Sequence, residues 1–447
     1  MTDNQRLKQA QRPQQISSAL HKFYRGKMET VPKCAVRKLD DFSVWYSPGV
    51  AAPCSDIFED PQLVYDYTSK WNTVAVISDG SRVLGLGDIG PKAGLPVMEG
   101  KALLYKYLGG VDAVPITLDT KDPDEIIRTV LLLQPAFGGV NLEDIEQPKC
   151  FRILDTLRRE AEIPVWHDDQ QGTATVTLAA LLNALKLTGR TIENSSIAFI
   201  GTGAANVACA RLIFGRGADP GACYMVDSRG ILGSHRDDIK ARRNEFAEKW
   251  QLCETTNRSG RRGGIAEAMK DVDVVISLSK PEPGTIESDW VRSMRRDPIV
   301  FACANPTPEI WPWDATEAGA AVVATGRSDF PNQVNNSVCF PAIFRGALDV
   351  RARTITDEMC FTAAEALASA VEKELSPTRI IPTMEDRAVF PFVATEVGLK
   401  AQEQGVAQLA VDRDTLLRSA TEIIERSHRL TGMMMQNGLI AAPEEEL

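Results

Sequence analysis

The sequence predicts an α/β fold made of two successive sheets with crossover helices, followed by a C-terminal helical segment. Three observations predict it. Short β-rich runs at residues 74–77, 113–118 and 163–166 alternate with helical stretches at 99–108 and 122–133, as in a sheet with crossover helices. A second set of β-rich runs begins at residue 197, and the chain is mostly helical from residue 357. We therefore expect domains at 1–187 and 188–356 and a helical segment at 357–447.

Length and composition limit the classes of protein. The 447 residues are too many for one ordinary core and fit two or three domains. With 44% hydrophobic and 25% charged residues, the composition is that of a soluble globular protein. A net charge of −10 argues against a nucleic-acid partner, because phosphates would be repelled. No apolar run approaches the length of a membrane span.

Cysteine usage predicts the compartment. The nine cysteines include no C-x-x-C pair, and residues 1–15 contain no apolar signal core. We expect reduced thiols and a cytoplasmic location. The first forty residues are polar and basic with scattered apolar anchors, which predicts a helix and an arm packed on a neighbour. The chain ends in an acidic tail at residues 444–446.

Two acidic pairs follow apolar runs of the first domain. Glu143 and Asp144 come after the run at 130–140, and Asp168 and Asp169 come after the run at 163–166, just before a helix predicted at 173–187. Open α/β enzymes keep their chemistry at such strand ends. Carboxylates are the hard oxygen ligands that Mg²⁺ and Mn²⁺ require, so the pairs predict one shared divalent metal. The alternative is that they are helix caps and solvated turn residues.

A second βαβ pattern begins after the boundary signal at residues 188–190. A strand at 197–200 is followed by a glycine-rich turn at 201–206, a helix at 207–214 and a strand at 223–227 that ends in Asp227. This order is typical of a Rossmann-type dinucleotide-binding domain, in which glycines admit the pyrophosphate and the acid meets a ribose hydroxyl. Further strands at 272–277, 299–302 and 321–324 would complete the sheet. The predicted cofactor-binding residues are Gly201, Gly203, Ala204, Ala205, Asn206, Asp227 and Asn305.

Two features weaken the dinucleotide assignment. Asn206 stands at the third glycine position, where a close approach of helix and strand would favour a smaller residue. The turn could also merely link strand and helix, with Asp227 as an ordinary acid at a strand end.

Seven segments, in order along the chain, resemble the malic enzyme family, which oxidises and decarboxylates malate to pyruvate and CO₂. They are YSPGVA at 46–51, VLGLGDIG at 83–90, PVMEGK at 96–101, NLEDI at 141–145, HDDQQGTA at 167–174, ANPTPE at 304–309 and PNQVNN at 331–336. The resemblance implies an oxidoreductase that uses NAD or NADP and Mg²⁺ or Mn²⁺. It further implies a compact bacterial type that forms a homodimer or a larger homo-oligomer.

The resemblance also implies roles for individual residues. Glu143, Asp144 and Asp169 would hold the metal, with Asp168 beside them as a catalytic-site carboxylate; spacing alone does not decide which of Asp168 and Asp169 is the ligand. Lys101 matches the general base and Tyr46 the general acid that protonates C3 of enolpyruvate. Arg82 suits recognition of a substrate carboxylate. The predicted substrate-binding residues are Arg82, Asn305, Asn335 and Asn336.

Each of these roles has a structural alternative. Lys101 could be a solvated charge, Tyr46 a packed turn residue and Arg82 an exposed loop residue, and asparagines are common in turns. To act as a base, Lys101 must be neutral part of the time, and desolvation beside a cation can lower its pKa. Gln171 stands where compact relatives often carry histidine, whereas His167 is expected to be structural because the donor set is all oxygen.

Cofactor preference and two rival functions remain open at this point. Asp227 favours NAD by accepting ribose hydroxyls, yet Arg229 could receive a 2′-phosphate. One rival is an enzyme for a related 2-hydroxy acid. The other is a catalytically silent metabolite-binding regulatory protein, against which the combination of acid, base and metal ligands argues.

Overall fold

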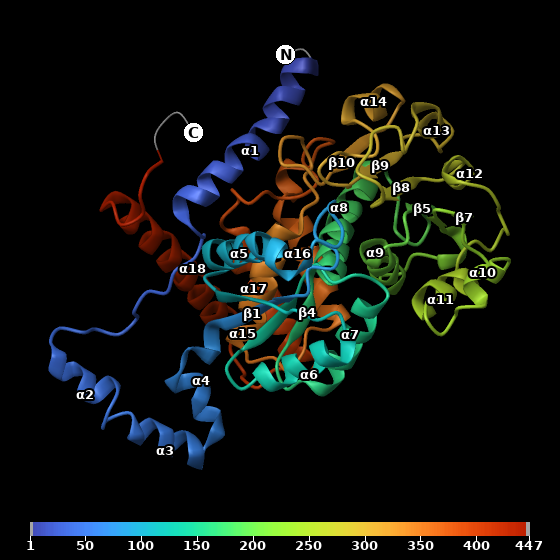
Figure 1. Ribbon diagram of the computed structural model, residues 1–447. Coiled ribbons are helices and arrows are strands. Elements are labelled where there is room, and N and C mark those ends of the chain that lie inside the picture. Colours follow the sequence, from blue (N-terminus) through green and yellow to red (C-terminus); the bar gives the residue numbers. More distant parts are fainter. Residues whose placement is uncertain (1–2, 444–447) are drawn as a thin grey trace.

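The computed structural model describes residues 3–443 and places two sheets side by side, with helices on their faces (Figure 1). The acidic tail expected at 444–446 lies outside the described residues. No helix in the described part of the chain is both long and apolar enough to cross a membrane.

The first sheet has the strand order β2-β1-β3-β4, and all of its strands are parallel. Its strands are β1 (Thr73–Ser78), β2 (Asp112–Thr117), β3 (Gly139–Leu142) and β4 (Val165–His167). Strand β1 is buried along its whole length, as expected for a central parallel strand covered on both faces. Sequence analysis predicted three of these strands and missed β3, whose Gly139 and Asn141 are residue types depleted in strands.

The second sheet has the strand order β10-β9-β8-β5-β6-β7 and is parallel except for β7. Its strands are β5 (Ile197–Ile200), β6 (Tyr224–Asp227), β7 (Gly230–Ile231), β8 (Val274–Ser277), β9 (Ile299–Ala302) and β10 (Val322–Thr325). The chain order reverses between β5 and β8, and ligands of such sheets bind at the carboxyl ends of strands at this switch point. The predicted Rossmann-type arrangement is confirmed.

Helices connect and cover the strands. They are α5 (Gly90–Gly109), α6 (Pro123–Leu133), α7 (Lys149–Glu160), α8 (Thr173–Leu187), α9 (Ala204–Gly215), α10 (Asp237–Lys240), α11 (Ala247–Thr255), α12 (Ile265–Met269), α13 (Ser288–Arg292) and α14 (Pro312–Glu317). Helix α5 begins nine residues before the predicted helix at 99. The prediction began too late because Pro96, a residue type that usually breaks a helix, lies inside α5. A π-helical turn, η4 (Asp168–Gly172), directly precedes α8.

The C-terminal helices complete the core. They are α15 (Phe340–Asp349), α16 (Asp357–Ala370), α17 (Val389–Glu403) and α18 (Arg413–Gln436). Helix α15 packs against α17 and α5, and α16 packs against α8. The fully buried Arg345 of α15 pairs with Asp349 and also donates to the Asn72 side chain, which directly precedes β1. These helices therefore share the core of the first sheet.

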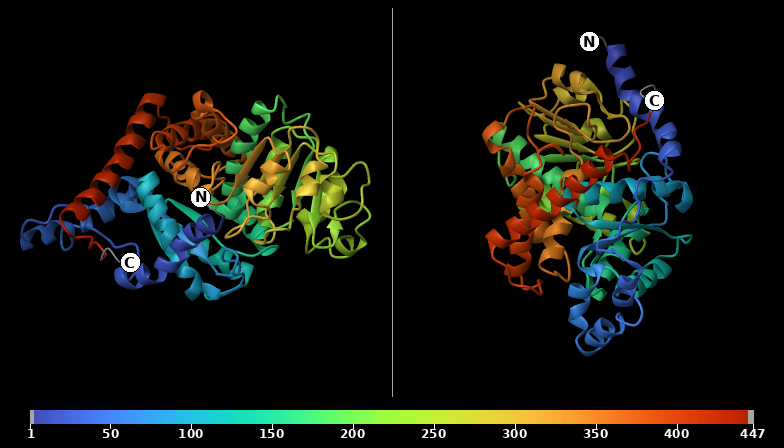
Figure 2. Two further views of the ribbon diagram at one scale, coloured as in Figure 1. Left: turned by 90° about the horizontal axis from the view of Figure 1, so that it is seen from above. Right: turned by 90° about the vertical axis from the view of Figure 1, so that its left-hand side faces the viewer.

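The N-terminal segment departs from the rest of the chain. It contains α1 (Asp3–Tyr24), α2 (Phe42–Trp45), α3 (Ala51–Glu59) and α4 (Val64–Tyr67). Figures 1 and 2 show α2 and α3 at the edge of the molecule in every view, and neither helix has a buried residue. The remaining short helices are η1 (Leu39–Asp41), η2 (Pro61–Leu63), η3 (Ser69–Asn72), η5 (Pro220–Ala222), η6 (Asn336–Val338) and η7 (Glu372–Glu374).

Candidate active site

Two neighbouring parallel strands bring the acidic pairs together. Strands β3 and β4 pair with Leu142 opposite His167, so the residues that follow each strand leave the sheet side by side. One carboxylate oxygen from each of Glu143, Asp144 and Asp169 lies within 4.8 Å of the others. We call these three residues the acidic cluster.

The π-helical turn separates the two consecutive aspartates. Asp169 stays with the cluster, and its carboxylate accepts a hydrogen bond from the Asp144 backbone N–H at 2.9 Å. Asp168 points elsewhere: its two oxygens accept from the Trp166 indole at 3.0 Å and from Lys101 Nζ at 2.5 Å. Single π-helical turns occur often at functional sites. The geometry thus distinguishes the two aspartates, which spacing in the sequence left open.

Gly172 makes this turn possible. A Cβ at position 172 would lie 2.0 Å from Oδ1 of Asp168, far inside contact distance. We expect Gly172→Ala to displace Asp168 and to lower kcat by about 10²-fold, the cost of roughly 1 Å of misplacement at a reacting centre. Steady-state kinetics and thermal unfolding check this. The matched control is Gly432→Ala in α18, where a Cβ meets nothing within 4 Å; equal activity of the two variants would contradict the prediction.

Lys101 is buried between two carboxylates. Its Nζ lies 3.0 Å from Glu143 Oε1, 2.5 Å from Asp168 Oδ2 and 4.2 Å from the centre of the Phe340 ring. Burial would lower the pKa of Lys101, but Asp168 and Glu143 outweigh burial and raise it. Sequence analysis expected desolvation beside a cation to lower the pKa of Lys101. The neighbours in the structure are anions, so desolvation alone does not make Lys101 neutral.

The acidic cluster has the charge of a cation site. Burial, reinforced by Asp169, raises the pKa of Asp144 to about 8, and burial also raises the pKa of Glu143 well above its usual value. Oδ2 of Asp144 is buried and has no hydrogen-bond partner among the described residues. Oxygen donors crowded in this way fit Mg²⁺ or Mn²⁺, whose charge would offset the repulsion.

The structure brings most of the other predicted residues toward this site. The Arg82 backbone N–H donates to the Asp144 carbonyl at 3.0 Å. The Asn336 Cβ lies 3.2 Å from the position of a Cβ on Gly172, beside Asp168. Asn335 instead uses its side-chain oxygen to cap η6, accepting from Ser337 N–H at 2.9 Å. The carbonyl oxygen of Asn305 approaches Gly85 in the loop that follows Arg82.

Tyr46 is not brought to the site. It follows α2 in the protruding segment, and 73% of its surface is exposed. The structural alternative, a packed turn residue, is also wrong for the single chain, because the side chain is largely exposed.

The predicted dinucleotide turn opens onto a cavity of about 890 Å³ at the carboxyl ends of β5, β6 and β8. Gly201 needs to be glycine, because its φ is +93° and a Cβ would lie 2.6 Å from the Leu278 carbonyl oxygen. The cavity is lined by Gly201, Asp227, Arg229, Gly264, Ser279 and Lys280, among others. A strand-end cavity of this kind suits the pyrophosphate and adenosine ribose of a dinucleotide.

The hydrogen bonds of the Asn206 side chain account for the asparagine at the third glycine position. It is completely buried, and its Nδ2 donates to the carbonyls of Ile200 at 2.7 Å and Gly201 at 3.0 Å. The side chain therefore ties α9 to the end of β5, so the helix and strand remain close. It supports the turn from inside and does not line the cavity.

Comparison with known proteins decides the family. The model of the malic enzyme N-terminal domain matches residues 25–158, and that of the malic enzyme NAD binding domain matches residues 170–402. The chain belongs to the malic enzyme family. It is 50% identical to the bifunctional malic/malolactic enzyme of Bacillus subtilis (strain 168), over 92% of this chain and 97% of that protein. It is 49% identical to the NAD-dependent malic enzyme of Geobacillus stearothermophilus, over 86% and 78%.

A solved structure agrees with this assignment. The crystal structure of Entamoeba histolytica malic enzyme superposes with a TM-score of 0.96 at 47% identity, covering 100% of this chain and 93% of that one. As a malic enzyme, the chain is a nicotinamide-dependent oxidoreductase, and other relatives are named NADP-dependent malic enzymes. The family resemblance and the fold class expected from the sequence are confirmed.

Sequence reasoning missed two residues that orient Glu143 in the acidic cluster. The buried Tyr105 hydroxyl donates to Asn141 Oδ1 at 2.8 Å, and Asn141 Nδ2 donates to Glu143 Oε2 at 2.9 Å. Tyr105 lies one helical turn after Lys101, on the same face of α5. That spacing was the available signal, but an aromatic residue on an apolar helix face is also an ordinary core residue.

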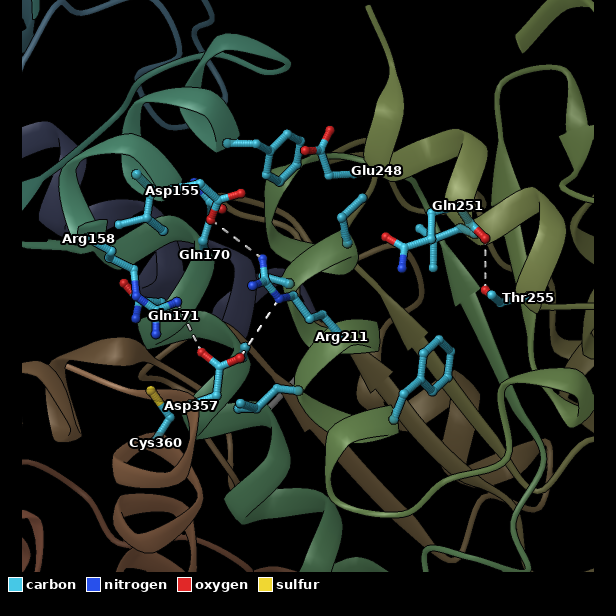
Figure 3. Close-up of a pocket in the computed structure, with 18 of the residues that line it drawn as sticks. Asp155, Arg158, Gln170, Gln171, Arg211, Glu248, Gln251, Thr255, Asp357 and Cys360 are labelled. Atoms are coloured by element: carbon cyan, nitrogen blue, oxygen red, sulfur yellow. Dashed lines mark hydrogen bonds and ion pairs between the residues drawn. The ribbon is translucent and has the colours of Figure 1, made fainter. Parts of the chain in front are cut away.

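Gln171 faces away from the acidic cluster. It lines a separate cavity of about 500 Å³, bounded by α7, η4, α9, α11 and α16 (Figure 3). Gln171 Oε1 accepts from the His167 backbone N–H at 3.1 Å, which supports the π-helical turn. The departure expected at Gln171 therefore leaves the acidic cluster unchanged.

Proposed function

We propose that the chain catalyses oxidative decarboxylation of L-malate to pyruvate and CO₂, with reduction of NAD(P) and a requirement for Mg²⁺ or Mn²⁺. One observation carries the proposal: the acidic cluster adjoins a buried lysine held by Asp168. A loop of the Rossmann-type domain, at Asn305, approaches the same edge. A buried lysine and a cluster of oxygen ligands adjoin in a chain that also carries a nicotinamide-binding domain, a combination that a binding module would not need.

A cation held by Glu143, Asp144 and Asp169 would polarise the C2 oxygen of malate and stabilise the charge left by decarboxylation. A bound nicotinamide would accept the hydride, and Lys101 would take the proton of the C2 hydroxyl. For that, the charge of a cation held by the acidic cluster would have to offset the carboxylates that raise the pKa of Lys101. Asp168, bonded to Trp166 and Lys101, keeps the amine beside the acidic cluster. Arg82 suits binding of a substrate carboxylate, and Asn305 and Asn336 would orient substrate and nicotinamide.

Absorbance of the reduced nicotinamide tests the proposal directly. L-Malate with Mn²⁺ should reduce NAD or NADP, yield pyruvate, and stop on addition of a chelator. Lactate is assayed in parallel, because one relative is named a malic/malolactic enzyme. Malate binding without turnover would favour the regulatory alternative, and turnover of another 2-hydroxy acid with malate inert would change the substrate.

Asp227 should favour NAD over NADP. Burial opposes its ionisation, but hydrogen bonds from Arg236 and Lys249 hold the pKa of Asp227 below its usual value, so it stays anionic. An anion accepts ribose hydroxyls and repels a 2′-phosphate.

We expect Asp227→Asn to lower the NAD-to-NADP ratio of kcat/KM by at least about tenfold, since a hydrogen bond to a charged group contributes ~1.5–3 kcal/mol. The amide still accepts from Arg236, which limits structural damage. Arg229→Ala, which removes a largely exposed cation of the same cavity, should move the ratio the opposite way. An unchanged ratio in Asp227→Asn would mean that the carboxylate only anchors Arg236.

A further inference from the structure

Two loops of the Rossmann-type domain meet the first domain at Gly85. The β8 loop, residues 278–286, follows β8 and supplies much of the lining of the dinucleotide cavity. The β9 loop, residues 303–308, follows β9 and carries Asn305. A Cβ on Gly85 would lie 3.5 Å from Pro281 Cγ in the β8 loop and 3.1 Å from the Asn305 carbonyl oxygen in the β9 loop. The placement of these loops therefore sets how the dinucleotide cavity faces the first domain.

Glu309, which follows the β9 loop, joins the two loops through its carboxylate. It is completely buried. Its Oε1 accepts three hydrogen bonds at the end of β8, from Ser277 Oγ at 2.7 Å, from the Ser279 backbone N–H at 2.8 Å and from Ser279 Oγ at 3.1 Å. Its Oε2 accepts from the Ala304 backbone N–H at 3.1 Å. An ionised carboxylate only accepts, so it suits a position that is surrounded by four donors.

The backbone carbonyl of Glu309 fixes the far end of the β8 loop. It accepts from the backbone N–H groups of Gly284 and Ile286, at 3.1 Å each. The β8 loop is thus bonded to Glu309 at both of its ends, and the β9 loop is bonded to it at Ala304, next to Asn305. The carbonyl bonds need no particular side chain. Holding both loops through the side chain, by contrast, needs two acceptor oxygens, which an amide does not have.

A buried carboxylate of the same sheet could instead serve stability alone, and Asp273 is such a residue. It directly precedes β8, at the opposite end of the strand from Glu309, and is 4% exposed. It accepts from the Ser196 backbone N–H at 2.9 Å and pairs with Arg190. These residues do not line the dinucleotide cavity. Asp273 therefore provides a comparison for Glu309 that lacks the link to the two loops.

We propose that Glu309 is a positioning residue for oxidation of the substrate: its carboxylate holds the β8 loop and Asn305 of the β9 loop in a fixed relation to the first domain. This inference rests on the proposed function for the reaction that is positioned. Glu309 is completely buried, so it acts through these loops. A misplacement of roughly 1 Å costs about 10²-fold in rate, so a small shift of either loop at Gly85 should be visible in the kinetics.

Glu309→Gln tests the need for the second acceptor oxygen. The side chain keeps its length, but its single oxygen can serve only one of the backbone N–H groups of Ser279 and Ala304, so one loop loses its anchor. At saturating malate and Mn²⁺, kcat/KM for the dinucleotide should fall by about tenfold or more, since an unpaired buried donor is costly. Asp273→Asn is the matched control: its melting temperature should also fall, but its kcat/KM should stay close to the wild-type value. Equal losses of kcat/KM in the two variants, or no loss in Glu309→Gln, would overturn the proposal.

Ser277→Ala provides a second variant in case Glu309→Gln does not fold, because it keeps Glu309 and both backbone hydrogen bonds. Ser277 is completely buried and does not line the dinucleotide cavity, so its hydroxyl acts on dinucleotide affinity only through Glu309 and Ser279, the groups that it bonds. The Kd of the reduced dinucleotide, measured by its fluorescence without malate, should rise about two- to tenfold, the effect of one lost hydrogen bond. An unchanged Kd contradicts the role of Glu309. Absence of malate turnover in the wild-type protein would instead refute the proposed function, and the binding measurement would still decide the role of Glu309.

Discussion

Lys101→Arg lowers kcat by about 10²- to 10⁴-fold, the usual contribution of a general base, although the positive charge at this position is retained. Arginine stays protonated at any working pH, so it cannot accept the C2 hydroxyl proton. It can still pair with Asp168 and Glu143, the carboxylates that hold Lys101. The variant therefore separates proton transfer from charge balance, and steady-state kinetics with malate provide the measurement.

Lys101→Met is the matched comparison. It removes the proton acceptor and also leaves two buried carboxylates without their cation, which is costly in a protein interior. We expect both variants to be inactive, but only Lys101→Met to show a clearly lower melting temperature. If Lys101→Arg kept near wild-type activity, lysine would serve only as a structural cation and the base would have to be another group.

Asp169→Asn weakens Mn²⁺ binding by about 100-fold or more, since loss of even a residue that supports a metal ligand costs 10–100-fold, whereas Asp168→Asn changes it little. The expectation follows from the π-helical turn, which leaves Asp169 in the acidic cluster and turns Asp168 toward Trp166 and Lys101. Free Mn²⁺, measured by its paramagnetic resonance signal, reports binding without reference to activity. Asp168→Asn should instead lower kcat. Equal loss of Mn²⁺ affinity in both variants would refute the distinction.

The Mn²⁺ affinity of the wild-type protein should rise with pH up to about pH 8. The pKa of Asp144 is raised to about 8 by burial and Asp169, so below that pH the folded site holds a proton that the cation must displace. Because the pKa of Asp144 is higher in the folded than in the unfolded state, the protonated carboxyl favours the metal-free fold at low pH. This contribution to the free energy of unfolding is lost as pH rises from about 4 to 8. Mn²⁺ should accordingly raise the melting temperature more at pH 8.5 than at pH 6, and an equal effect would contradict the assignment.

Much of the fold was predictable, because its signals are local. The run at 74–77, the glycine turn at 201–206 and the acid at Asp227 each depend on a few consecutive residues whose period or backbone requirement shows in the sequence. Parallel strands then bring their carboxyl ends to one edge, which is why the acidic pairs could be expected to meet. Strand β3 and helices α7, α15 and α17 were missed. β3 contains Gly139 and Asn141, residue types that are depleted in strands. Helix α17 is buried on most sides and has little amphipathic pattern.

The sequence by itself thus determined the α/β class, the Rossmann-type turn and the identity of the acidic residues, since these follow from short-range patterns. Only the tertiary structure decided the directions of Asp168 and Asp169, the bonding of Asn206 to β5, and the exposure of Tyr46. Each of these depends on contacts between residues far apart in the chain, such as Lys101 with Asp168. A side chain's role is set by the groups that packing places around it, and local sequence does not encode that neighbourhood.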